Sequence, residues 1–250
     1  MTIEKSYTTL WETMVLNLTP AQQSLLDFLV KRITENKSQY AKVSKEAYDI
    51  PPLIIAAIHA MESGCDFSAH LHNGDPLTNV TKNYPAGRPV IKLADGTLKT
   101  HNFTWVESAV DALKSEIWRI NPTDWCLENS LLFLEAYNGF GYKRRGILSP
   151  YLWAGTRHYT KGKYTKDGFF DPNAVSKQVG ACVILNRLGY RASEQKAPRH
   201  FYLEMRGEEV VALQTLLNKM LPPNNQLVVD GWLGSKTSAA MTAVFGRSAF

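Results

Sequence analysis

Glu62 is the residue whose type and position point most directly to catalysis. It follows residues 53–61, which are apolar almost all round and therefore predict a buried helix. Pro51 and Pro52 suit the start of that helix, and Gly64 suits its end. The negative end of the helix dipole and apolar surroundings both raise the pKa of a carboxyl group placed there. A general acid needs a raised pKa near neutral pH, so Glu62 is a candidate for that role.

A second carboxylate, Asp75, follows a predicted β-hairpin. An apolar–polar alternation leads into Asn73-Gly74, which is a strong hairpin turn signal. His70 and His72 would share one face of the strand, where they could bind a metal ion. We expect them instead to be polar residues on the solvent side of the hairpin, and we predict no metal site.

The order of buried helix, terminal Glu-Ser-Gly and hairpin resembles the lysozyme-like superfamily, in particular goose-type lysozymes, lytic transglycosylases and phage endolysins. In that superfamily the catalytic Glu closes a core helix, and a β-hairpin forms the other wall of the sugar cleft. The resemblance implies a lysozyme-like helical domain with a small β-hairpin wall, and Glu62 as its catalytic acid. The alternative is a solvated Glu at a frayed helix end.

A second motif, Ala-Tyr-Asn-Gly, occupies residues 136–139 at the predicted end of a helix. It partly resembles the Ala-Tyr-Asn-Ala-Gly type motif of lytic transglycosylases and goose-type lysozymes, but it lacks the second Ala. The resemblance implies that Tyr137 and Asn138 lie near Glu62 and the N-acetyl sugar of the substrate. An Asn-Gly pair is also typical of a helix C-terminus, and such a cap can line a cleft as well.

Residues 143–171 predict a long loop that is rich in aromatic and basic side chains. Loops of this length are usually functional or disordered, and the aromatic content argues against disorder. Aromatic faces suit sugar rings, and basic groups suit the anionic lactyl-peptide substituents of peptidoglycan. We expect this loop to line the substrate cleft, with packing over the core as the alternative. The predicted substrate-binding residues are Tyr137, Asn138, Tyr142, Tyr151 and Trp153.

The remaining pattern of residues 1–189 predicts a mainly α (α+β) catalytic domain. Capping boxes at Thr19/Gln22 and Thr104/Glu107 begin two helices, and Asp95-Gly96 marks a second hairpin. The expected elements are helices over residues 20–33, 40–48, 53–63, 105–117, 124–137 and 172–188, and hairpins over residues 67–75 and 91–100.

Residues 204–250 predict a compact unit that follows a polar linker over residues 190–203. Two helices flank a Gly-rich turn, in a pattern that closely resembles the small three-helix peptidoglycan-binding domain of many cell-wall hydrolases. Leu233 departs mildly from that pattern, because Phe is frequent at its position. The resemblance implies a wall-binding module with Asp230 and Trp232 as candidate contacts. The matching residues are Val210, Leu213, Gln214, Leu217, Asn218, Asp230, Gly231, Gly234 and Thr237.

Composition limits the classes of function. The chain has 250 residues, 44% of them hydrophobic, and a formal net charge of +5, which predicts a packed core and a basic surface. Such a surface suits polyanions, but no nucleic-acid-binding motif accompanies it, and we expect no nucleic-acid partner. No apolar run is long enough for a transmembrane helix, so we predict no membrane insertion. Cys65, Cys126 and Cys182 are scattered, which predicts buried thiols in a reducing compartment.

The first residues lack a basic segment followed by an apolar one, which predicts synthesis in the cytoplasm without a signal peptide. The protein would then act on the cell wall after release or delivery, as a phage endolysin or a secreted effector does. We expect a monomer that binds bacterial peptidoglycan and needs no cofactor.

Together these features predict a glycosidase that cuts the β-1,4 bond between N-acetylmuramic acid and N-acetylglucosamine. Glu62 would protonate the leaving oxygen, and a second carboxylate would activate water or attack the sugar. Asp75 is our candidate for that carboxylate, with Asp66 and Asp95 as further options. Thr78 or Thr81 could instead position the water.

Other functions stay open at this point. A lytic transglycosylase uses one Glu and forms an anhydro sugar without water. A chitinase of the same broad fold is a second enzyme alternative, which the wall-binding module disfavours. A catalytically inactive wall-binding protein or phage structural component belongs to a different class, and a nucleic-acid-binding role is the weakest candidate.

Overall fold

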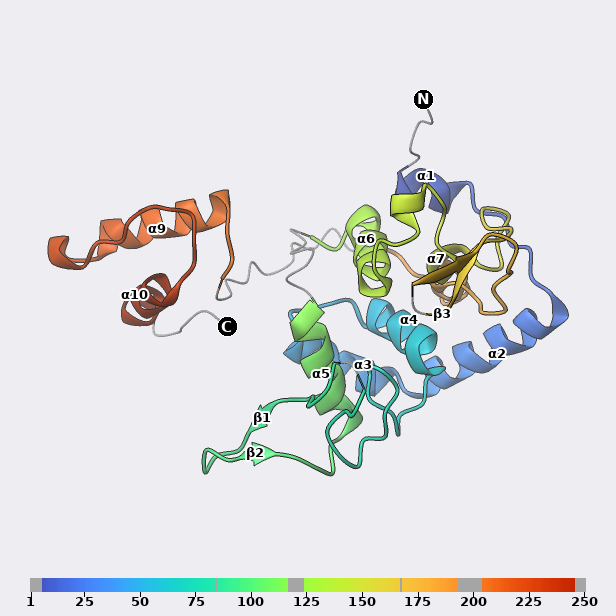
Figure 1. The fold of residues 1–250 in the computed structure, drawn as a ribbon, viewed down its shortest axis with the longest axis horizontal. Coiled ribbons are helices and arrows are strands. Elements are labelled where there is room, and N and C mark those ends of the chain that lie inside the picture. Colours follow the sequence, from blue (N-terminus) through green and yellow to red (C-terminus); the bar gives the residue numbers. More distant parts are fainter. Residues whose placement is uncertain (1–5, 84, 117–123, 167, 193–203, 246–250) are drawn as a thin grey trace. The chain divides into compact units, whose positions relative to one another are not determined.

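The computed structural model describes residues 6–83, 85–116, 124–166, 168–192 and 204–245. The chain divides into two compact units, residues 1–198 and 199–250, and the division lies within the stretch predicted as a linker. The described residues are mainly helical, with a few short strands (Figure 1), which confirms the predicted mainly α class. No helix in this part of the chain is long and apolar enough to cross a membrane.

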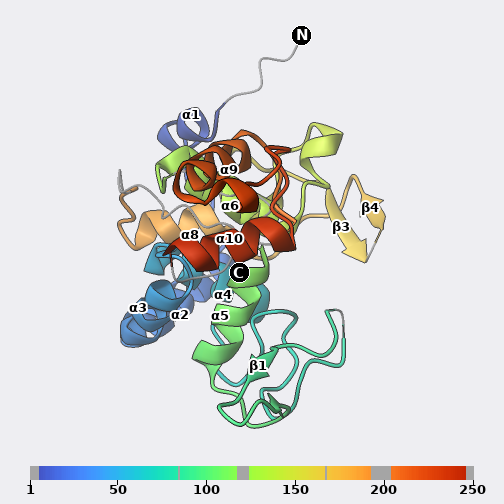
Figure 2. The ribbon, with the colours of Figure 1, turned by 90° about the vertical axis from the view of Figure 1, so that its left-hand side faces the viewer.

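The first unit is built around α4, which spans Pro52–Ser63. Every residue from 54 to 61 is buried, because α4 packs against α3, α6 and α8 (Figure 2). An all-round apolar helix is stable only where neighbours cover all its faces. The other α-helices of this unit are α1 Tyr7–Glu12, α2 Pro20–Glu35, α3 Lys37–Glu46, α5 Trp105–Glu116, α6 Leu127–Asn138, α7 Pro150–Trp153 and α8 Ala181–Arg187.

Both predicted capping boxes are present. At the start of α2 the Thr19 hydroxyl accepts from the Gln22 backbone N–H, and the Gln22 side chain accepts from the Thr19 N–H. At the start of α5 Thr104 and Glu107 exchange the same two bonds. These reciprocal bonds satisfy N–H groups that the first helical turn leaves without partners, which is why the short motif locates a helix start.

Two small antiparallel hairpins are attached to the helices. Strands β1 (Ile91–Lys92) and β2 (Leu98–Lys99) pair with Ile91 opposite Lys99, and the Asp95 carboxylate closes their turn by accepting from Thr97 N. The predicted second hairpin is therefore confirmed. Strands β3 (Lys163–Lys166) and β4 (Phe169–Asp171) form the other pair. Figures 1 and 2 show the two hairpins well apart on the first unit.

The predicted first hairpin is an irregular chain reversal. Only one isolated bridge, between Ala69 and Pro76, is present there among the described residues. The expected solvent-facing position of its two histidines is wrong, because α5 covers that face. His70 is buried between the Ser108 hydroxyl and the Asn79 carbonyl, and the His72 side chain is 2% exposed with Nε2 2.8 Å from Asp111. The histidines therefore tether the reversal to α5.

Two other expectations need correction. Residues 143–171 are not an unstructured loop: they hold a 3₁₀ turn at Lys143–Arg145, α7 and the β3–β4 hairpin. Among the described residues of this unit the last helix, α8, begins at Ala181 and not at residue 172, and Gly180 is its N-cap in an extended conformation. Gly180 packs so closely on the Leu152 carbonyl that a Cβ there would clash. Residues 172–178 are irregular and mostly exposed, and the chain becomes continuously buried only at residues 179 and 180.

The second unit contains α9 (Glu208–Met220), a 3₁₀ turn at Pro223–Asn225 and α10 (Ser235–Phe245). Apolar residues of both α-helices pack around Leu233. The buried Gln214 amide organises the connecting turn: Nε2 donates to the Asp230 carboxylate at 2.8 Å, and Oε1 accepts from Gly231 N at 2.9 Å. The buried apolar residues of this unit are Met205, Val210, Leu213, Leu217, Leu233, Ala240 and Met241.

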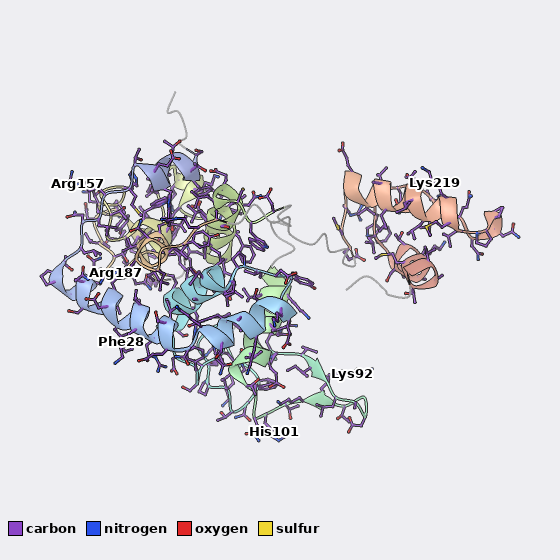
Figure 3. The ribbon with its side chains drawn as sticks, turned by 180° about the vertical axis from the view of Figure 1, so that it is seen from behind. Phe28, Lys92, His101, Arg157, Arg187 and Lys219 are labelled. Atoms are coloured by element: carbon purple, nitrogen blue, oxygen red, sulfur yellow. The ribbon has the colours of Figure 1, made fainter. Side chains whose placement is uncertain are left out.

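The three cysteines are free thiols. Cys65 and Cys182 are buried as predicted, and Cys126 is only partly buried. Basic side chains such as Lys92, Arg157 and Arg187 stand outward on the first unit (Figure 3).

Candidate active site

Glu62 lies in the last turn of α4, as the sequence predicts. Gly64 ends the helix in the left-handed conformation, with φ 61°. The two closing bonds run from Gly64 N to the Ala60 carbonyl (3.1 Å) and from Cys65 N to the His59 carbonyl (3.2 Å). Glycine adopts this conformation without a Cβ penalty, so the helix stops within two residues of Glu62.

Buried polar groups fix the end of α4. His59 is fully buried one turn before Glu62, and its Nε2 donates to the Asp66 carbonyl at 3.1 Å. Its Nδ1 then accepts from the Tyr40 hydroxyl at 3.1 Å. Burial lowers the pKa of His59 to about 4, so the ring stays neutral and keeps these two roles. Arg32 adds a bond to the Cys65 carbonyl at 3.1 Å.

The surroundings of Glu62 favour its protonated form. The Tyr151 hydroxyl donates to Glu62 Oε1 at 3.0 Å. Burial raises the pKa of Glu62 to about 7, and the Tyr151 hydrogen bond offsets part of that rise. The Glu62 side chain nevertheless keeps solvent access. Glu62 as a residue is exposed, so its carboxyl loses part of its water to neighbouring groups while a substrate could still reach it.

Tyr151 of α7 reaches this carboxyl, and Tyr137 of α6 lies close to Tyr151. Tyr151 lies in α7, whose N-cap Ser149 accepts from the Tyr151 backbone N–H. Tyr137, near the end of α6, is close enough to Tyr151 to contribute to the raised pKa of the Tyr151 phenol, after burial as the main cause. The Tyr137 hydroxyl donates to the Leu71 carbonyl at 3.2 Å. The structure therefore gathers Glu62, Tyr137 and Tyr151, three of the predicted site residues.

Asn138 and Tyr142 line a neighbouring cavity of about 560 Å³. Asn138 Nδ2 lies 3.5 Å from the Ser149 hydroxyl, and the buried Tyr142 accepts from Tyr164 N at 3.1 Å. The placement of Trp153 differs from the expectation for a substrate-binding residue. Its side chain is 1% exposed and packs edge-on against His158, so it supports the core beneath α7 and offers no face to a sugar.

Asp75 is committed to closing its own loop. Its carboxylate accepts from the backbone N–H groups of Lys82 (2.8 Å) and Asn83 (3.0 Å), and from the side-chain amides of Asn83 (2.6 Å) and Asn73 (3.2 Å). The backbone bond from Asn83 is the largest cause of the lowered pKa of Asp75. These bonds stabilise the ionised form, and none of them connects Asp75 to Glu62.

The two threonines have different surroundings. The Thr81 hydroxyl is buried, where it donates to the Pro85 carbonyl and accepts from Arg88 N. Thr78 is exposed, and its hydroxyl accepts from the Asn79 side chain at 3.3 Å. Thr81 therefore has a structural task, and Thr78 is the freer of the two to bind water.

In the second unit, Asp230 and Trp232 have separate roles. Asp230 accepts from Gln214 and from Trp232 N at 2.9 Å, so it holds the turn together. The Trp232 ring is 38% exposed, with the Arg206 guanidinium 5.1 Å from its centre and Nε1 bonded to Glu204. Of this pair, Trp232 presents the surface that a ligand could contact.

No group of three or more His, Cys, Asp or Glu side chains that could hold a metal ion occurs among the described residues. No family model matches the chain, and comparisons with curated proteins and with solved structures gave no match either. The function therefore has to be inferred from Glu62 and its surroundings.

The hydrogen bonds that fix the end of α4 have a signal in the sequence. His59 is the one ring nitrogen donor inside the apolar run of residues 53–61. A buried polar group of this kind requires hydrogen-bond partners. Its spacing, one turn before Glu62, places those partners at the end of the helix that carries the candidate acid.

Proposed function

We propose that the protein is a peptidoglycan-degrading glycosidase with Glu62 as its general acid. It cuts the β-1,4 bond between N-acetylmuramic acid and N-acetylglucosamine. The observation that carries the proposal is the pKa of Glu62, raised to about 7 in an accessible position beside Tyr151. The resemblance of residues 62–64 and 136–139 to the lysozyme-like superfamily supports the choice of substrate.

The first step follows from this electrostatic setting. At neutral pH a large share of Glu62 is protonated and can give its proton to the glycosidic oxygen. The bond between that oxygen and the sugar carbon breaks, and its electron pair goes to the leaving oxygen. The Tyr151 hydroxyl remains hydrogen-bonded to the resulting carboxylate, which limits the cost of leaving a charge there.

The second step has two alternatives. In one, Asp75 activates water, as the sequence predicts; its carboxylate would first have to give up hydrogen bonds to the loop. In the other, Glu62 acts alone and a hydroxyl of the substrate closes an anhydro ring, as in a lytic transglycosylase. Burial, not a neighbouring carboxylate, is the cause of the raised pKa of Glu62, which favours a single-acid site.

The second unit serves as the wall anchor in this proposal. The exposed Trp232 ring offers an aromatic face, and rings of this kind stack on sugars. The net charge of +5 favours attraction to an anionic wall. The protein thus acts as an endolysin-like monomer that reaches the wall after release from the cytoplasm or delivery.

The test compares wild type with Glu62→Gln on purified peptidoglycan, by loss of turbidity and by mass spectrometry of the fragments. We expect activity in the wild type and its loss in the variant. Reducing ends would show hydrolysis, and 1,6-anhydro ends would show transglycosylation. Equal activity of the two proteins would contradict the role of Glu62. An inactive wild type that still co-sediments with the wall would favour a non-catalytic wall-binding protein.

A further inference from the structure

The cavity that Asn138 and Tyr142 line is also bordered by basic residues. Arg144, Lys163 and Lys166 all border its volume of about 560 Å³. None of the described residues that line it is acidic; Asp167, next to Lys166 in the sequence, lies outside the described residues. Three positive charges around one concave surface repel each other, so an anion bound among them would be stabilised.

These three cations lack carboxylate partners among the residues that the structure describes. Lys163 stands opposite Asp171 in the β3–β4 pair, but Asp171 accepts from the backbone N–H groups of Asn173 and Ala174. Lys166 lies over the Phe169 ring, 5.3 Å from its centre. Neither the bonds of Asp171 nor the Phe169 ring neutralises these charges, so they can still attract an anion.

The neighbouring Arg145 shows the contrasting arrangement. It donates to the Tyr164 hydroxyl at 3.0 Å and stacks on Phe170, 4.7 Å from the ring centre. Arg145 is thus part of the framework that holds the β3–β4 hairpin, and it does not line the cavity. Arg145 thus holds the hairpin in place, whereas Arg144, Lys163 and Lys166 border the cavity.

The wall that carries the cations is firmly attached to the end of α6. The Tyr142 and Tyr164 rings meet edge-on with centres 5.1 Å apart, and Tyr142 accepts from Tyr164 N. At Gly141 a Cβ would meet the Tyr164 ring at 3.2 Å, so close approach of hairpin and helix end needs a small residue there. Because the hairpin is already held in place, little conformational entropy is lost in ordering its backbone when a ligand binds.

Two residues that line the cavity are chain neighbours of the tyrosines near Glu62. Asn138 and Pro150 line the cavity. Their sequence neighbours Tyr137 and Tyr151 belong to the Glu62 cluster, and Tyr151 contacts the carboxyl itself. A ligand whose sugar reaches Glu62 could therefore extend a side branch into the cavity.

We propose that this cavity binds a carboxylate of the stem peptide attached to the sugar strand. The inference rests on the proposed function, because the peptide is carried by the N-acetylmuramic acid at the bond that Glu62 cuts. The stem bears free carboxylates a few bonds from the sugar, and Arg144, Lys163 and Lys166 match that charge. The polar side chains of Asn138, Ser176 and Gln178 line the same space and suit the peptide amides.

The first experiment measures cleavage of intact glycan strands and of strands stripped of stem peptides by an amidase. The wild type is expected to cut intact strands faster. In Arg144→Ala/Lys166→Ala the ratio of the two rates should fall roughly tenfold, as expected for loss of hydrogen bonds to a charged group. Lys161→Ala is the matched control, because Lys161 is exposed on the same segment but does not line the cavity. An unchanged ratio in the double variant would overturn the proposal.

The second experiment is independent of catalysis. Glu62→Gln is titrated calorimetrically with the free stem tripeptide, L-alanyl-D-isoglutamyl-diaminopimelate, with and without the double substitution. We expect binding that weakens roughly tenfold in the double variant and with added salt. Absence of binding, or equally tight binding of inorganic phosphate, would overturn the proposal. A wild type that binds the tripeptide but cuts no strand would instead remove the proposed glycosidase function.

Discussion

The end of α4 and the loop over residues 75–83 carry the two carboxylates considered for catalysis, and their surroundings act in opposite directions. At Glu62 burial raises the pKa to about 7, and one hydroxyl donates a hydrogen bond. At Asp75 two backbone and two side-chain N–H donors converge on the carboxylate, and its pKa falls. Loss of water favours the neutral form, whereas donated hydrogen bonds favour the ion.

This comparison separates a carboxyl that can transfer a proton from one that holds a loop. Each environment follows from packing: Glu62 lies in the last turn of a helix whose residues 54–61 are all buried, and Asp75 lies in a reversal where the backbone N–H groups of Lys82 and Asn83 donate to its carboxylate. Backbone N–H groups need hydrogen-bond acceptors, and a carboxylate forms a stronger hydrogen bond with them than a neutral acceptor does.

The largest expected difference between the two carboxylates is in the activity of their variants. Glu62→Gln removes the transferable proton, so the cleavage rate on peptidoglycan should fall by about 10²–10⁴-fold. Asp75→Asn should lower the rate far less if Asp75 only closes its loop. Turbidity assays on both purified variants check this. A loss in Asp75→Asn that equals the loss in Glu62→Gln would restore Asp75 as the second catalytic carboxylate.

The substitution Glu62→Gln should lower activity but raise the stability of the fold at alkaline pH. Because its folded-state pKa lies above the ordinary value near 4.5, folding favours the protonated form, and stability is lost as pH rises through about 7. The full shift corresponds to about 3 kcal/mol, and solvent access reduces this to about 1 kcal/mol. Glu62→Gln should therefore unfold at higher urea concentration than wild type at about pH 8.

The same pair of proteins provides the control. At about pH 4 Glu62 is protonated in both folded and unfolded chains, so the two urea midpoints should nearly coincide. A wild type that is more stable than Glu62→Gln at about pH 8 would show that the ionised carboxylate is favoured in the fold.

Tyr151→Phe tests the hydrogen bond from Tyr151 to Glu62. The Tyr151 hydroxyl lowers the pKa of Glu62, so its removal should raise that pKa further. The upper limb of the pH–activity profile should move to higher pH by about half a unit to one unit, as one hydrogen bond is worth about 1 kcal/mol. A shift to lower pH would mean that the hydroxyl supports the neutral acid. Tyr159→Phe is a suitable control, since its hydroxyl bonds to Gly162 and Ser176 instead.

The smallest effect is expected at the loop of Asp75. Since the pKa of Asp75 is lowered in the fold, its contribution is present above the ordinary value near 4 and is lost as pH falls below it. Amide hydrogen exchange at Lys82 and Asn83 should then show added local opening at acid pH, after correction for intrinsic rates. Asp75→Asn should show the opening at neutral pH as well. Equal protection in wild type at both pH values would contradict the loop-closing role.

Several features of the site could be predicted from the sequence because they depend on neighbours within one or two turns. The burial of residues 54–61, the stop at Gly64 and hence the position of Glu62 follow from apolar patterning and one glycine. The same holds for the capping boxes at Thr19 and Thr104 and for the turn at Asp95. The mainly α class follows from the sum of such local signals.

Tertiary structure decided the features that depend on distant contacts. The bond between Tyr151 and Glu62 joins residues 89 positions apart, and no local pattern encodes that meeting. The burial of His70 and His72 depends on α5, which packs over a face expected to be open. The hydrogen bonds of Asp75 depend on the chain reversal that brings Lys82 close. The β3–β4 hairpin likewise brings Lys163 and Lys166 to the same cavity as Arg144. Patterning shows which side chains prefer burial, but only packing decides which of them meet.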